Sequence, residues 1–150
     1  MGWHYEQQQP GRRYETAGRT IGEFEISSFA GLTGDYNPMH TDAQYAAASP
    51  FGRIIGHGAL GFAIAVGLLN RTGMMDETAL AFLGMSEWRF AAPIFAGDTV
   101  HVSGEIVAAR RSSSQPGGII THRLELTNQD GAIVQTGSLS FLVKYAPPDD

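Results

Sequence analysis

The stretch from Gly58 to Leu69 constrains this chain more than any other part of it. It reads Gly-Ala-Leu-Gly-Phe-Ala-Ile-Ala-Val-Gly-Leu-Leu and carries no polar or charged side chain. A helix that is apolar on every side has to be buried. Its three glycines each cost roughly 1 kcal/mol of helix propensity relative to alanine, but they let another backbone approach closely. The sequence therefore predicts a helix over residues 58–69 that a sheet wraps around.

The chain after this helix changes to the two-residue alternation that is typical of strands. A turn signal stands at Asp130-Gly131, and residues 112–118 form a longer hairpin connection. Trp88 and Phe90 fall on one face of the first segment, and we expect both side chains in the core. Strands are predicted at residues 79–90, 99–109, 119–128 and 133–143. One buried helix before an antiparallel meander indicates an α+β fold.

The first part of the chain is more polar and contains shorter elements. Residues 1–18 are expected to form an extended polar segment, and Thr20-Ile21 a short strand. The spacing of apolar residues predicts a helix over 23–33 that Gly34 ends. A second short helix is expected at residues 43–48, capped by Asp42. The organisation that follows is a polar segment at 1–18, a single domain at 19–145 and a short tail at 146–150.

Composition excludes several classes of partner and site. With 150 residues, of which 43% are hydrophobic, the chain can bury one core. A formal net charge of -5 argues against nucleic acid and anionic membranes as partners. The chain has no cysteine, which excludes disulfides, thiolate metal sites and a cysteine nucleophile, and agrees with a cytoplasmic location. No signal peptide and no apolar run long enough to span a bilayer are recognised.

A carboxylate and an imidazole lie close together in the loop that follows Gly34. Asp35 stands five residues before His40, and Asn37 and Pro38 between them bend and stiffen the loop. A carboxylate and an imidazole held in this way can divide proton transfers between them. Taken alone, Gly-Asp is also a common turn pair, and a single histidine is more often structural than catalytic.

The helix over 58–69 begins directly after a histidine. The first backbone N–H groups of a helix have no partner inside the helix, and its dipole favours negative charge there. Gly58 lacks a side chain, so a ligand could approach its N–H group closely. His57-Gly58 is therefore a candidate site for a developing negative charge.

The remaining histidines and acidic residues do not indicate a metal site. The five histidines show no ligand spacing such as His-Glu-x-x-His, and we expect no metal. Asp98, at the start of a predicted strand, is expected to have a structural role. The histidines are His4, His40, His57, His101 and His122.

The blocks described above resemble those of the R-specific enoyl-CoA hydratases of the MaoC-like group. The resemblance rests on Gly-Asp-Tyr-Asn-Pro-Met-His at residues 34–40, Ile-Ile-Gly-His-Gly at 54–58, and the later Trp-Arg-Phe, Pro93 and Gly-Asp-Thr at 97–99. It covers about residues 20 to 143. It implies a hot-dog fold, in which a sheet wraps one long helix, and a homodimer or higher homo-oligomer with acyl-CoA bound at the dimer interface.

The resemblance also implies roles for individual residues. Asp35 and His40 are expected to share the catalytic water, and the N–H of Gly58 to hold the thioester oxygen. Asn37 and His57 are expected to support these residues from behind. No cofactor is implied, because CoA arrives as part of the thioester substrate.

Two alternatives remain open at this point. A hot-dog thioesterase would use a carboxylate to direct water at the carbonyl carbon. A non-catalytic acyl-CoA-binding module would be favoured if Asp35 or His40 were missing, and both are present. The acyl chain length, the direction of the reaction and the contacts to the CoA phosphates cannot be read from the sequence. Arg53, Arg110 and Arg111 are candidates for those contacts, although each is more often simply a solvated charge.

Overall fold

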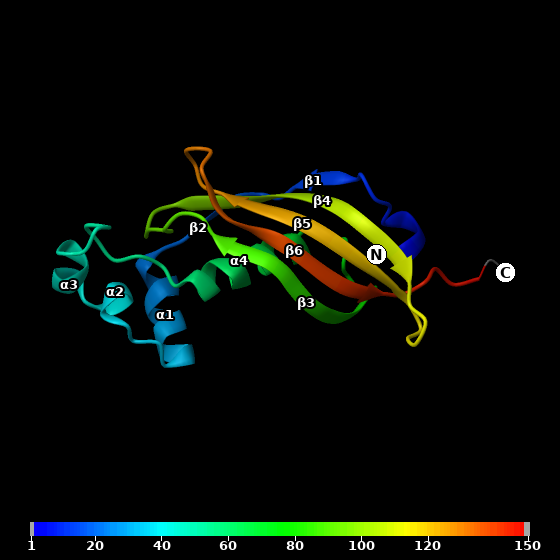
Figure 1. Ribbon diagram of the computed structural model, residues 1–150, viewed down its shortest axis with the longest axis horizontal. Helices are drawn as coiled ribbons and strands as arrows, with labels where there is room; N and C mark the ends of the chain where they lie inside the picture. Colours follow the sequence, from blue (N-terminus) through cyan, green and yellow to red (C-terminus); the bar gives the residue numbers. More distant parts are fainter. Residues whose placement is uncertain (1, 149–150) are drawn as a thin grey trace.

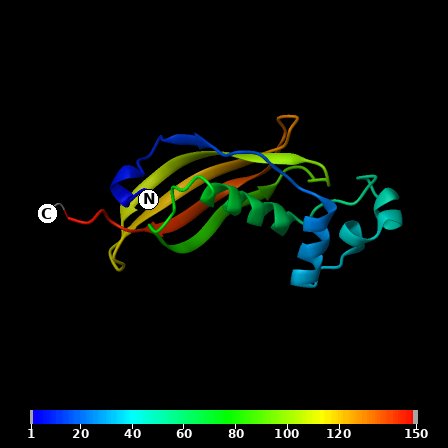
Figure 2. The ribbon, with the colours of Figure 1, turned by 180° about the vertical axis from the view of Figure 1, so that it is seen from behind.

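The computed structural model describes residues 2–148. A six-stranded antiparallel sheet curves around the long helix α4 (Gly58–Asn70), as Figures 1 and 2 show from opposite sides. The strands follow the order β1-β4-β5-β6-β3, and β2 also pairs with β4. Their bounds are β1 Arg13–Glu15, β2 Arg19–Thr20, β3 Ala79–Phe90, β4 Thr99–Arg111, β5 Gly118–Thr127 and β6 Ile133–Val143. The predicted α+β fold is confirmed.

Helix α4 buries one face against the sheet. Leu60, Ile64 and Leu68 are buried in the same core as the inward side chains of β5. Burying a side chain of this kind contributes roughly 1.5–3 kcal/mol, which outweighs the glycine cost of about 1 kcal/mol per residue. The opposite face, with Ala59, Ala63 and Gly67, is exposed. The expectation of burial on every side is therefore wrong for the single chain, because the sheet covers only one side of the helix.

Several predicted elements occur where the sequence places them, and two described helices were missed. Helix α1 (Glu23–Thr33) ends at Gly34, whose φ of 77° is left-handed and suits glycine. Helix α3 (Ala43–Ala47) is capped by Asp42, which accepts hydrogen bonds from the backbone N–H groups of Gln44 and Tyr45. The missed helices are α2 (Pro38–Thr41) and the 3₁₀ helix η1 (Tyr5–Gln7).

The N-terminal segment is part of the sheet. Strand β1 pairs antiparallel with β4, with Tyr14 opposite Gly104. The division of the chain at residue 18 stays a prediction, but residues 13–15 are not simply an extended lead-in.

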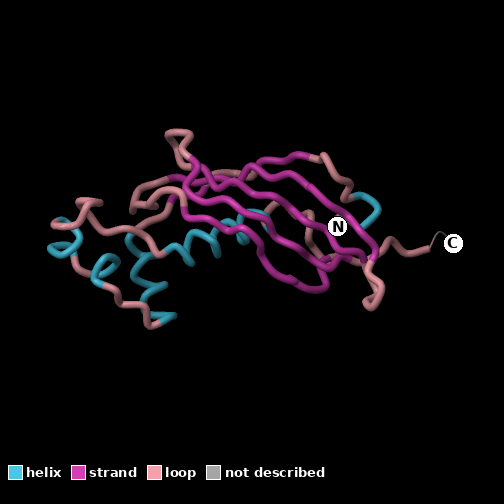
Figure 3. The backbone as a smooth tube through the Cα atoms, viewed as in Figure 1, coloured by secondary structure: helices cyan, strands magenta, loops and turns pink. Residues whose placement is uncertain are grey.

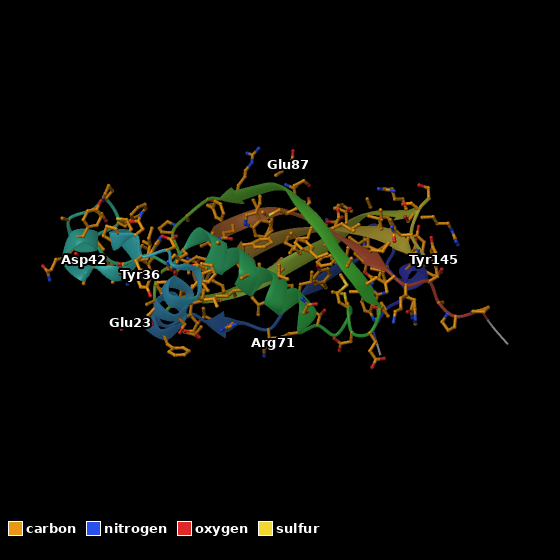
Figure 4. All side chains as sticks on the ribbon, turned by 90° about the horizontal axis from the view of Figure 1, so that it is seen from below. Glu23, Tyr36, Asp42, Arg71, Glu87 and Tyr145 are labelled. Carbon is orange, nitrogen blue, oxygen red and sulfur yellow. The ribbon has the colours of Figure 1, made fainter. Side chains whose placement is uncertain are left out.

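Helices α1–α3 extend beyond one end of the sheet, and the two chain ends lie near the other. Figure 3 shows the helices in cyan beyond the magenta strands, and Figure 4 places Tyr36 and Asp42 at the opposite end from Tyr145. The segment from α3 returns to the sheet through a bridge between Ile55 and Phe95, directly before α4 begins. The start of α4 therefore lies where the projecting helices meet the sheet.

Strand β3 forms one edge of the sheet and differs from the prediction at its end. It pairs with β6 alone among the described strands, and a bulge occurs where Glu87 adopts a φ of 53°. Trp88 packs against the core, with its ring 4.9 Å from that of Phe62. Phe90 is 61% exposed, so its predicted core position is wrong in the single chain. One side of its ring lies against Gly58 at the start of α4, and the other described residues leave the rest of the side chain open.

Asp98 has the expected structural role. It is buried, and its carboxylate accepts hydrogen bonds from the Phe95 backbone N–H at 2.8 Å and the Gln129 side chain at 3.0 Å. These contacts fix the loop that leads into β4. Among residues 2–148, no helix has the length and apolar character needed to cross a bilayer.

Candidate active site

Local hydrogen bonds fix the loop that carries Asp35. The Asp35 carboxylate accepts a hydrogen bond from the Asn37 backbone N–H at 3.2 Å, and the Asp35 N–H donates to the Thr33 hydroxyl at 3.3 Å. The Asn37 side chain in turn accepts from the Met39 backbone N–H at 3.0 Å, which caps α2. Pro38, the first residue of α2, fits this position because it has no N–H to satisfy. Asn37 therefore orders the loop, while the Asp35 side chain is exposed.

Helix α2 presents His40 with one ring nitrogen already engaged. Its Nδ1 lies 2.7 Å from the backbone carbonyl oxygen of Ile55. A carbonyl can only accept, so Nδ1 carries the proton of this hydrogen bond. In the neutral ring the lone pair is then on Nε2, which can act as a base. The half-buried His40 thus has a fixed orientation and a defined tautomer.

His57 supports both candidate catalytic residues from the interior. It is 2% exposed, and its ring stacks on that of His40 with centroids 3.8 Å apart and planes at 28°. Its Nε2 lies 3.0 Å from the Asp35 carbonyl oxygen, so this nitrogen donates. Its Nδ1 is buried and has no hydrogen-bond partner among residues 2–148. One imidazole therefore holds the backbone of Asp35 and the ring of His40 together.

The structure brings Asp35, His40 and His57 into one cluster. Each offers an oxygen or nitrogen atom, and these atoms lie within 4.8 Å of one another. A group of this size could hold a metal ion, but the carbonyl contacts already occupy one nitrogen on each ring. The absence of a metal stays a prediction. The same spacing suits one water molecule held between a carboxylate and an imidazole.

Gly58 stands next to this cluster as the first residue of α4. The His57 side chain does not cap the helix, and the first backbone hydrogen bond inside it runs from Gly61 to the His57 carbonyl. The N–H groups of the first turn thus have no partner within the helix. A Cβ atom at residue 58 would lie 2.9 Å from the Phe90 ring, so glycine is needed for this close packing.

Two hollows adjoin the cluster. The larger, of about 740 Å³, is lined by His40 together with Phe24, Tyr36 and Arg53. The smaller, of about 270 Å³, is lined by Gly58 and Phe90. His40 and Gly58 therefore each line a hollow that a ligand can enter, although the two hollows are separate.

The sequence profile of the MaoC like domain matches residues 6–127. The chain belongs to the MaoC-like family. It is 34% identical over 119 residues to an (R)-specific enoyl-CoA hydratase of Aeromonas caviae, a match that spans 79% of this chain and 84% of that enzyme.

Solved structures show that the fold is the hot-dog fold predicted for this MaoC-like domain. A MaoC-like dehydratase of Rhodospirillum rubrum superimposes with a TM-score of 0.86 at 29% identity, over 98% of this chain and 100% of that chain. A monoamine oxidase regulatory protein of Archaeoglobus fulgidus superimposes with a TM-score of 0.89 at 34% identity, over 97% of each chain.

The three candidate arginines of this MaoC-like domain lie in different places. Arg53 lines the larger hollow with His40, and its guanidinium lies 3.9 Å from the centre of the Phe95 ring. Arg111 instead lies over Tyr145, at the end of the sheet away from α1–α3. Arg110 is exposed on the same strand as Arg111. Only Arg53 of the three is close to the site.

Sequence reasoning missed a pair of residues behind Gly58. Gln135, on β6, donates a hydrogen bond to the Gly58 carbonyl oxygen at 3.0 Å, and its own carbonyl accepts from the Trp88 indole N–H at 3.0 Å. A signal was present, because the alternation of β6 puts Gln135 on the same face as Leu139 and Phe141. A glutamine on an inward face requires partners there.

Proposed function

We propose that this protein catalyses the reversible addition of water to a trans-2-enoyl-CoA, which gives the (R)-3-hydroxyacyl-CoA. The observation that carries the proposal is the convergence of Asp35, His40 and His57 within 4.8 Å beside the free start of α4 at Gly58. The likeness to the Aeromonas caviae hydratase, over 84% of its length, supports the same reaction class. A hydro-lyase reaction is redox-neutral, so it requires no redox cofactor.

The geometry suggests how the chain would perform the reaction. A water molecule held between the Asp35 carboxylate and His40 Nε2 would lose a proton to one of them while its oxygen bonds to C3 of the substrate. The electron pair of the double bond moves toward the thioester, whose oxygen gains negative charge. The Gly58 N–H would stabilise that oxygen. A proton then passes to C2, so no atoms are lost and the reverse sequence is the dehydration.

A homodimer is part of the proposal. Strand β3 leaves one edge unpaired among the described strands, and an edge of this length is a template for another strand. It carries exposed apolar side chains at Leu80, Phe82, Leu83 and Met85. A second copy that pairs with β3 would also cover Phe90, which packs on Gly58. The acyl-binding space would then lie between the two copies.

The test monitors the conjugated double bond of an enoyl thioester. Purified protein mixed with crotonyl-CoA should remove the enoyl absorbance without releasing free thiol, and the product should be the (R)-hydroxy thioester on chiral analysis. Asp35→Asn serves as the control, because the amide keeps the size of the side chain and its acceptor for Asn37.

Other outcomes would contradict the hydratase proposal in different ways. Thiol release with the enoyl group intact would indicate a thioesterase. Binding of the thioester without either reaction would indicate a non-catalytic module. A cytoplasmic location remains a prediction of the cysteine-free sequence.

A further inference from the structure

The side chain of Gln135 joins three elements next to the start of α4. Its amide nitrogen donates to the Gly58 carbonyl oxygen at 3.0 Å, and its amide oxygen accepts from the Trp88 indole N–H at 3.0 Å. The residue is 2% exposed, so water does not compete for these bonds. Helix α4, strand β6 and strand β3 are thus connected through one amide group.

Two glycines make room for this connection. A Cβ atom at Gly61 would overlap the Gln135 amide, and one at Gly137 would lie 2.6 Å from the Trp88 ring. Without a side chain at these positions, the glutamine reaches the helix backbone and the indole packs closely on β6. The packing therefore fixes the rotamers of both Gln135 and Trp88.

Gly58 is held from both sides by these contacts. On its N-terminal side, His57 is fixed through Asp35 and His40, and the Gly56 N–H donates to the Ile94 carbonyl at 2.7 Å. On its C-terminal side, Gln135 binds the Gly58 carbonyl oxygen. Glycine has unusually free backbone dihedrals, so its N–H direction is well defined only if both flanking peptide groups are held.

We propose that Gln135, oriented by Trp88, is a positioning residue that aims the Gly58 N–H at the thioester oxygen. The proposal rests on the hydratase function proposed above. Gln135 need not touch the substrate, since it acts through the backbone of Gly58. A small change in the direction of a preorganised donor is costly because a misplacement of about 1 Å can cost about 10²-fold in rate.

The central variant is Gln135→Met, which keeps the length of the side chain and removes both hydrogen bonds. Its matched control is Gln8→Met. Gln8 is also buried, and its amide donates to the Trp3 carbonyl at 2.9 Å, but it directly follows η1. The N-terminal segment with η1 lies at the opposite end of the molecule from α1–α3 (Figure 1). Both substitutions remove a buried amide, so both should lower the melting temperature. Only Gln135→Met should alter the candidate active site.

Two measurements separate positioning from a general loss of structure. With crotonyl-CoA, Gln135→Met should lower kcat by about 10- to 100-fold while KM changes less than about threefold, and Gln8→Met should keep kcat. In amide NMR spectra of the whole protein, the Gly58 resonance should shift or broaden in Gln135→Met and stay in place in Gln8→Met. Trp88→Phe, which leaves the glutamine in place but frees its oxygen, should show the same changes in weaker form.

The proposal is overturned if folded Gln135→Met keeps the parental kcat, or if Gln8→Met loses kcat to the same degree. If Gln135→Met does not fold, Trp88→Phe provides the test instead. An unchanged Gly58 resonance together with an unchanged kcat in Trp88→Phe would then contradict the proposal. If the parent protein hydrates no enoyl thioester, the proposed function fails by itself. The Gly58 resonance then still shows whether Gln135 holds the helix start.

Discussion

Two backbone carbonyls decide which nitrogen of each imidazole carries a proton at this site. The Ile55 carbonyl takes the proton of His40 Nδ1, and the Asp35 carbonyl takes that of His57 Nε2. The lone pair of His40 Nε2 remains available, whereas that of His57 Nδ1 is buried without a partner among the described residues. An unsatisfied buried polar atom costs about 1–3 kcal/mol. Packing alone would therefore not favour a histidine at position 57. Its stacking on His40 gives a reason for a histidine there.

The first prediction concerns Asp35 and His40 as a pair. Asp35→Asn and His40→Gln should each lower kcat by roughly 10²–10⁴ with little change in melting temperature, because acid–base steps contribute about that much. If both residues act on the same water, the double variant should be hardly worse than the poorer single variant. Steady-state kinetics of the three variants provide the test, with melting curves as the folding control. Losses that multiply fully would contradict a shared water.

At the scale of elements, a half-buried tyrosine of β1 binds a buried histidine of β5 and helps to hold β1 on the sheet. The Tyr14 hydroxyl lies 2.9 Å from His122 Nδ1, and the Tyr14 ring occupies the space left by Gly104. Burial lowers the pKa of His122 to about 4 and raises the pKa of Tyr14. The hydrogen bond therefore joins an uncharged hydroxyl and a neutral imidazole.

The second prediction is a loss of stability in acid. The pKa of His122 falls from its ordinary value of 6.5 to about 4 in the fold, so between these pH values the unfolded chain binds a proton that the folded chain does not. The free energy of unfolding is therefore not reduced by His122 above about pH 6.5. It decreases by on the order of 3 kcal/mol as the pH falls to about 4. Urea unfolding across this range measures the slope. The double variant Tyr14→Phe/His122→Leu should show a flatter slope, and an unchanged slope would exclude His122 as its source.

The sequence predicted elements whose signals are local and missed features that depend on distant contacts. The bounds of α1 follow from apolar spacing and from Gly34, and the apolar run from Gly58 defines α4. Helix α2 is too short for a periodic signal. The bulge at Glu87 and the exposure of Phe90 depend on pairing with β6, which the sequence of β3 alone does not contain. The stacking of His57 on His40 could likewise not be predicted, because it depends on the path of the segment that leads from α3 back to the sheet.

At the scale of the whole molecule, two of the apolar surfaces that the described residues leave open bear on the proposed dimer. One is the free edge of β3 with Met85, and the other is the face of α4 with Ala59, Ala63 and Gly67. Small side chains on a helix allow another helix to approach closely. Since this sheet edge and this helix face are both exposed, a second copy of the chain could cover both.

The third prediction tests this dimer. Met85→Lys places a charge on the exposed edge and should shift the protein from dimer to monomer in sedimentation experiments, with loss of activity. Val107→Lys is the matched control, because Val107 is also an exposed apolar residue on a strand but lies on β4 inside the sheet. It should stay dimeric. A parent protein that is monomeric at assay concentration and fully active would rule the proposed dimer out.

The candidate acid–base residues and the N–H donor all come from one continuous stretch, Asp35 to Gly58, whereas β3 to β6 lie entirely after it. The candidate site residues and the later strands are thus separate parts of the sequence. In the proposed hydratase, the stretch before the long helix can keep its chemistry while substitutions along the later strands change the shape of the space proposed for the acyl chain. One contact between these two parts is the hydrogen bond from the Gln135 amide of β6 to the carbonyl oxygen of Gly58, the first residue of α4. Directed evolution toward new acyl groups should therefore find accepted changes along β3 and few at Gln135.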